Sequence, residues 1–148
     1  MELRAELLPP VVTERQRAEL EREIERVGEL VRAGAPGAAA AVRAFNARTG
    51  HDRAPYDFLA YYGSRSLEEF ALELARPARP KVDGVTVGEL AELVRRALAA
   101  EPESEWYLRV LTVNVAHPRA VDVLFHGRDG ATPEEMVAEL LSYRPIVL

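Results

Sequence analysis

The feature that most constrains this chain is a helix-start signal that recurs along it: a Ser or Thr followed three residues later by Glu or Gln. The signal begins at Thr13, Ser66, Thr86 and Thr132. In such a capping box the hydroxyl and the longer side chain each accept a hydrogen bond from a backbone N–H that the helix leaves unpaired. Apolar residues then recur every three to four positions, the period of a helix with one buried face. The pattern predicts an all-α fold.

The same reasoning places the other helices. The first helix should end near Gly34, and a second should run from about Ala38 to Arg48 with Gly50 as its stop. The helix that begins at Thr86 is expected to bury a stripe made of Val87, Leu90, Ala91, Val94 and Leu98.

Two later segments bear more directly on function. The helix expected from Ser104 to about Val115 is apolar on two sides, which fits either full burial or partial use in binding. The apolar segment from Val121 to Phe125 has no evident partner strand, so a short helical turn is preferred there. The apolar tail, residues 146–148, is expected to dock on the core.

Charge is distributed unevenly. The chain carries a net charge of −5. Residues 1–81 hold 13 basic and 13 acidic side chains, whereas residues 82–148 hold 6 and 11. An acidic surface repels nucleic acid and attracts basic partners, although an ordinary solvated face has the same composition. The balance changes at a Pro- and Gly-containing joint, residues 77–84. We therefore expect an N-terminal helical subdomain, residues 1–80, packed on a second domain, residues 84–148.

Composition narrows the possible chemistry. The chain has no cysteine, which excludes disulfides, thiolate nucleophiles and Cys-ligated metals. The first residues lack a secretory apolar stretch and no apolar run is long enough to span a membrane, so we expect a cytoplasmic protein. The histidines stand at His51, His117 and His126, and none has metal-ligand spacing. His51 is expected to face solvent. We expect no catalytic residue, no metal and no cofactor.

The C-terminal half has a more specific order of residues. His117-Pro118 is followed by Asp122 and the apolar residues Val123 to Phe125, then by Thr132-Pro133 and finally by Tyr143-Arg144. This order resembles the immunity proteins of the colicin E and S-type pyocin DNases, over residues 84–145. The resemblance implies a four-helix fold whose third helix is a single turn, and tight binding to a nuclease toxin beside its active site.

The resemblance also implies which residues would touch the toxin. The short third helix would supply the central contacts, with Asp122, Phe125 and His126 at the family's contact positions and Val121 where Ser or Thr is usual. The preceding helix would select the toxin through Glu101, Ser104, Glu105, Leu108, Arg109 and Thr112. This chain departs from the family pattern in that Phe125 lacks a tyrosine hydroxyl, His126 replaces a second tyrosine, and Gly127 stands where proline is usual.

Three functions are therefore weighed. The first is a bacteriocin immunity protein, a monomer when free, which binds and inhibits a cognate nuclease toxin by blocking its nucleic-acid-binding surface. It would bind neither nucleic acid nor a membrane itself. The second is a helical interaction module, a regulator or scaffold, with a partner that is not a nuclease. The third and least favoured is a small enzyme or metal protein that uses His117, Asp122 and His126.

Overall fold

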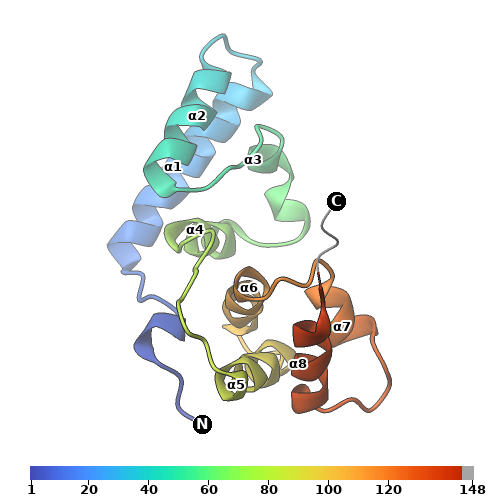
Figure 1. Cartoon of the computed structure of the whole chain (residues 1–148). Coiled ribbons are helices and arrows are strands. Elements are labelled where there is room, and N and C mark those ends of the chain that lie inside the picture. Colours follow the sequence, from blue (N-terminus) through green and yellow to red (C-terminus); the bar gives the residue numbers. More distant parts are fainter. Residues whose placement is uncertain (145–148) are drawn as a thin grey trace. The chain divides into compact units, whose positions relative to one another are not determined.

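The computed structural model describes residues 1–144 and shows an all-helical protein, with no strand in that range (Figure 1). None of the helices within residues 1–144 has the length and apolar character needed to cross a membrane. In chain order the elements are η1 (Ala5–Leu7), α1 (Glu14–Arg32), α2 (Ala38–Thr49), α3 (Asp57–Ala60), η2 (Tyr61–Gly63), α4 (Leu67–Ala75), α5 (Val87–Leu98), α6 (Ser104–Asn114), α7 (Ala120–His126) and α8 (Pro133–Ser142).

The chain forms two compact units. One, the middle unit, comprises Pro10–Ala78. The other, the split unit, comprises Met1–Pro9 together with Arg79–Leu148. The sequence-based division into residues 1–80 and 84–148 differs from this one at the start of the chain, because the first nine residues pack with the C-terminal helices. A few apolar residues ahead of the first long helix give no local sign of so distant a partner.

The middle unit is built on aromatic side chains. Helices α1 and α2 lie side by side as a hairpin, and α3 and α4 pack against α1 (Figure 1). The ring of Phe58 meets Phe45 edge-on with centroids 5.1 Å apart, and it meets Phe70 edge-on at 6.5 Å. Tyr61 stacks on the other side of Phe70 at 4.8 Å. Edge-to-face and offset-stacked pairs of this kind add to the stabilisation that burial alone gives.

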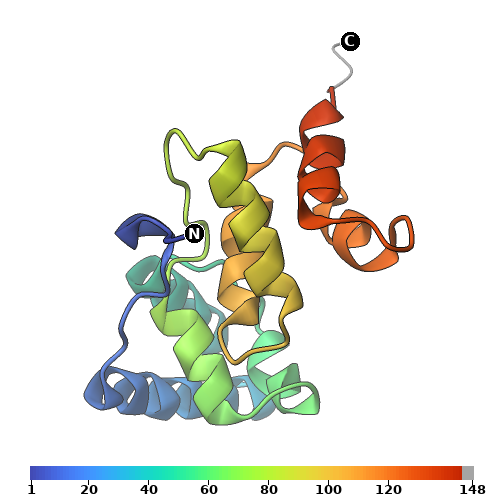
Figure 2. The same cartoon turned by 90° about the horizontal axis from the view of Figure 1, so that it is seen from below.

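The split unit is closed by the N-terminal segment, Met1–Pro9. Its helices α5 and α6 lie side by side, α8 contacts α5, and α7 contacts α6 and α8 (Figure 2). Leu3 and Leu7 join the aliphatic core of these helices, and Leu7 is 0% exposed. The indole N–H of Trp106 donates a hydrogen bond to the carbonyl oxygen of Leu7 at 3.1 Å. The N-terminal segment is therefore a structural part of this unit.

An ion pair between Arg4 and Glu89 holds the same segment in place. Glu89 is buried and accepts hydrogen bonds from the Arg4 guanidinium through both carboxylate oxygens, at 2.8 and 3.1 Å. These bonds, together with a backbone N–H from Thr86, hold the pKa of Glu89 below its usual range against the opposing effect of burial. Two parallel hydrogen bonds between a guanidinium and a carboxylate fix the orientation of both groups. Arg4 therefore determines how the N-terminal segment is held against α5.

All four predicted capping boxes are present. Thr13, Ser66, Thr86 and Thr132 each accept from the backbone N–H three residues on, and the side chain there reaches back to the cap. Helix α2 ends at Gly50, as predicted, where φ is 76°. That left-handed conformation is strained for residues with a side chain, so the glycine stops the helix without a penalty.

Three sequence-based expectations are wrong in detail. The single-turn helix is longer, since α7 has seven residues and about two turns. His51 is not in solvent: it is 7% exposed, and its Nε2 lies 2.8 Å from the carbonyl oxygen of Arg76, to which it donates. Val87 is exposed at the start of α5, whereas Leu93 and Ala97 take part in the core. The tail expected to dock, residues 146–148, lies outside the described residues.

Candidate partner-binding surface

The residues of helix α7 fall into a buried set and an exposed set. Ala120, Val123 and Leu124 are buried in the core of the split unit. The remaining residues, Val121, Asp122, Phe125 and His126, are exposed. Positions four apart share a helix face, so these four form one outward surface, which we call the α7 face. All four were singled out from the sequence as contact residues, and the helix brings them together.

The α7 face exposes apolar area that the fold itself does not cover. Phe125 is 48% exposed and Val121 is 44% exposed, and both flank the carboxylate of Asp122. A partner that covers this ring and this valine would remove their apolar surface from water. Each Å² of apolar surface buried in this way stabilises a complex by about 25 cal/mol. Aromatic side chains, Phe among them, are enriched in the cores of protein–protein interfaces.

The end of α7 explains one departure from the family pattern. A Cβ added at Gly127 would lie 2.5 Å from the carbonyl oxygen of Val123 and 3.4 Å from its carbonyl carbon. Real Cβ atoms do not approach backbone that closely, and every residue other than glycine carries one. Glycine therefore lets the chain turn tightly off α7, and the proline usual at this position would require the backbone to shift.

The residues proposed on the preceding helix have different roles. Glu101 and Glu105 are exposed near the start of α6 and remain available to a partner. Leu108 is partly buried against the core. The hydroxyl of Ser104 accepts from the backbone N–H of Glu101 at 2.8 Å and donates to the carbonyl of Arg96 at 3.0 Å, so it builds the turn between α5 and α6.

The last two residues of that set lie farther along α6. The hydroxyl of Thr112 donates to the carbonyl oxygen of Arg109 at 3.1 Å, within its own helix. Both side chains are half-buried. The proposed selecting surface of α6 is therefore reduced mainly to two glutamates at its start. Ser and Thr hydroxyls often bond the nearby backbone, and in this chain the hydroxyls of Ser104 and Thr112 do so.

His117 makes contacts within the turn that precedes α7. The Nδ1 atom of His117 accepts the backbone N–H of Arg119 at 2.9 Å, and its ring lies against Tyr143 with centroids 5.3 Å apart. This imidazole helps to shape the turn before α7. Among residues 1–144, no group of three or more His, Asp and Glu side chains is arranged to hold a metal ion.

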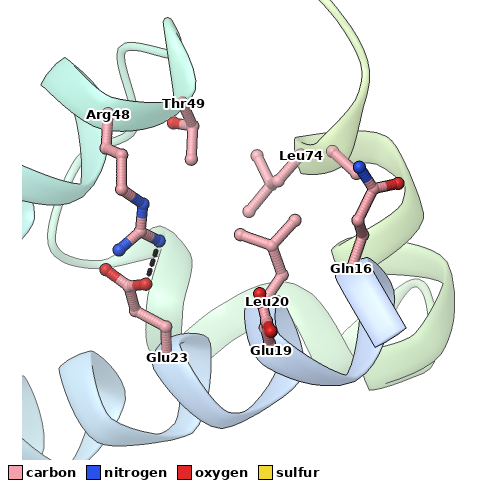
Figure 3. Close-up of a pocket in the computed structure, with 8 residues that line it drawn as sticks. Gln16, Glu19, Leu20, Glu23, Arg48, Thr49 and Leu74 are labelled. Carbon is pink, nitrogen blue, oxygen red and sulfur yellow. Dashed lines mark ion pairs between the residues drawn. The ribbon is translucent and has the colours of Figure 1, made fainter. Parts of the chain in front are cut away.

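A second feature, in the middle unit, has no counterpart in the sequence-based predictions. A cavity of about 530 Å³ lies between α1 and the C-terminal ends of α2 and α4 (Figure 3). Its lining residues are Gln16, Glu19, Leu20, Glu23, Arg48, Thr49, Leu74 and Ala75. The one sequence feature that indicates this cavity is on α1. There the polar residues Gln16 and Glu23 stand four and three positions from Leu20, where the helical period would place apolar core residues.

No protein-family model, no curated protein sequence and no solved structure matches this chain.

Proposed function

We propose that this protein is a bacteriocin immunity protein, which binds a cognate nuclease toxin in the cytoplasm of the producing cell and blocks its nucleic-acid-binding surface. The observation that carries the proposal is the α7 face. The order of residues from His117 to Arg144 resembles the colicin and pyocin immunity proteins, and the residues at that family's contact positions, Asp122, Phe125 and His126, are all exposed.

The charge of the split unit supports the same proposal. It holds 13 acidic and 9 basic residues. A nuclease surface that binds phosphate is basic, so an acidic protein is steered towards it and competes there with the nucleic acid. Occlusion and repulsion of the substrate are sufficient for inhibition, so the inhibitor itself needs no catalytic group.

The capping glutamate of α8, Glu135, lies on this acidic surface and also serves the fold. Glu135 in the first turn of α8 is exposed, and hydrogen bonds from the backbone and side chain of Thr132 hold its pKa below the usual range. A carboxylate at a helix N-terminus is favoured by the helix dipole. The helix starts of the split unit thus keep their negative charge at neutral pH while serving the fold.

The test begins with a search for a gene that encodes a basic nuclease domain next to this chain's gene, and then measures inhibition of that nuclease. Co-expression of the full chain should rescue growth, and the purified chain should stop DNA or RNA cleavage at a one-to-one ratio. Phe125→Ala and Asp122→Ala should each weaken binding by about 2 kcal/mol or more if they form a hot spot. Binding is measured by titration calorimetry or by competition.

Matched variants separate the α7 face from a general surface effect. Asp129→Ala removes an exposed carboxylate from the loop after α7, and Tyr62→Ala removes an exposed ring from the middle unit. Both should bind the nuclease as the native chain does. No binding to the nuclease, or equal affinity for the α7 variants and these controls, would contradict the proposal and favour a helical interaction module with a different partner.

A further inference from the structure

The cavity in the middle unit combines an apolar floor with a negative rim. Leu20 on α1 and Leu74 on α4 point toward one another across it (Figure 3). Two carboxylates stand on the α1 side, Glu19 and Glu23. The lining also includes the last residues of two helices, Thr49 of α2 and Ala75 of α4. Helix C-termini carry partial negative charge, so they add to the field of the carboxylates.

The rim already binds one guanidinium, which belongs to Arg48 of the protein itself. The guanidinium of Arg48 pairs with Glu23, and its planar group also lies 5.9 Å from the ring centre of Phe45. Glu23 is additionally 3.9 Å from Arg26. Glu19, in contrast, meets only Arg15 among the contacts described, at 3.4 Å, and that arginine is 90% exposed. An exposed pair of this kind is worth little, so Glu19 is the carboxylate best placed to receive a new cation.

We propose that this cavity binds an arginine side chain of a partner polypeptide. The aliphatic stem and a neighbouring apolar residue would cover the half-buried Leu20, and the guanidinium would sit at Glu19 near the ends of α2 and α4. A volume of about 530 Å³ falls in the range of ligand pockets and exceeds what a lone guanidinium fills. Arginine combines an apolar stem with a planar cation, which matches a floor of leucines under a rim of carboxylates.

The inference goes beyond the proposed function and does not rest on it, because it concerns the middle unit and the α7 face belongs to the split unit. Arg48 acts as an internal competitor in this arrangement. Removing the charge of Glu19 should weaken the site, whereas removing the charge of Arg48 should strengthen it by freeing Glu23. These opposite signs distinguish a built site from a patch of surface charge.

The experiment is an NMR titration of the ¹⁵N-labelled full chain with the blocked dipeptide acetyl-Leu-Arg-amide. The matched ligand acetyl-Leu-citrulline-amide has nearly the same shape without the charge, and acetyl-Arg-amide lacks the leucine. We expect saturable shifts at the amides of Gln16, Leu20, Thr49 and Ala75, with an affinity of roughly 1 mM. The shifts should be absent with citrulline and weaker without leucine, and they should fall as salt is raised.

Two variants complete the test. Glu19→Gln should weaken binding about threefold, and Arg48→Met should strengthen it about threefold, the range expected for one exposed ion pair. The spectrum of each unliganded variant reports whether the fold is kept. Shifts that do not saturate, shifts equal to those with citrulline, or the same affinity in both variants would overturn the inference. None of these outcomes depends on whether the α7 face binds a nuclease.

Discussion

The middle unit closes on a run of aromatic side chains within one continuous stretch, whereas the split unit closes on aliphatic side chains drawn from both ends of the chain. They also differ in charge: the middle unit has 11 acidic and 10 basic residues, and the split unit has 13 and 9. Phe125 is half-exposed in the split unit, whereas the exposed rings of the middle unit, Tyr56 and Tyr62, each carry a hydroxyl. The two units of one helical chain therefore differ both in the side chains that build their cores and in the charge that they carry.

The largest expected effect tests whether the N-terminal segment belongs to the split unit. Leu7→Ala should destabilise that unit by about 2–5 kcal/mol, because the deleted side chain is fully buried and leaves a cavity. Leu8→Ala, which changes a neighbour that is 37% exposed, is the matched control and should cost far less. Hydrogen exchange read residue by residue separates the units. Equal protection of α5 and α6 in the two variants would contradict this division.

A smaller effect is expected in the middle unit. Phe58→Leu should cost about 1–3 kcal/mol, because leucine restores part of the volume but neither edge-on contact with Phe45 and Phe70. Loss of protection should concentrate in α1 to α4. Tyr56→Leu, at an exposed position of the same segment, provides the comparison and should be close to neutral. Denaturant unfolding measures both, and similar losses in the two would argue against an aromatic core.

Gly127→Ala links stability to recognition. The added Cβ would collide with the backbone of Val123, so we expect a loss of about 1–3 kcal/mol. Because the collision lies at the end of α7, the variant should also bind the nuclease less tightly than its stability alone predicts. Gly63→Ala meets nothing within 4 Å and serves as the control. Native affinity in Gly127→Ala would show that the tight turn does not position the α7 face.

The smallest expected effect concerns pH. The pKa of Glu89 is lowered in the folded chain, chiefly by its hydrogen bonds from Arg4. Such a group stabilises the fold above its unfolded pKa of about 4.3, and this contribution is lost as the pH falls through the folded value. Thermal unfolding of Glu89→Gln between about pH 6 and 3 should therefore change less steeply than that of the native chain. An identical slope would show that the Arg4–Glu89 ion pair does not contribute to the dependence of the split unit's stability on pH.

Local signals explain how much of this fold the sequence predicts. The four capping boxes and the stop at Gly50 depend on residues within three or four positions, and each is found where the sequence indicates. The inward and outward sets of α7 follow from the same periodicity. The contact residues proposed on α7 come from the family resemblance, and helical geometry then leaves Asp122 and Phe125 exposed beside the buried Val123 and Leu124.

Several of the expectations that failed depend on partners outside the segment from which they were predicted. Leu3 and Leu7 pack against helices that follow the whole of the middle unit, and the buried His51 donates a hydrogen bond to the carbonyl oxygen of Arg76. The hydroxyl of Ser104 is occupied by backbone groups on both sides of a turn. The cavity beside Leu20 likewise exists only because the ends of three helices converge. Spacing within one segment carries no information about such convergence.

The split unit has a consequence for how the chain folds as it leaves the ribosome. Leu3, Arg4 and Leu7 are synthesised first, but their partners on α5 and α6 emerge only after the entire middle unit. The middle unit has its whole core available by then and can fold on its own, since domains generally form as units during synthesis. The beginning of the chain must wait, with two leucines unprotected, until the later helices arrive. A nascent chain stalled when Ala78 has left the ribosomal exit tunnel but α5 has not should therefore show a folded middle unit with an N-terminus that proteases still reach.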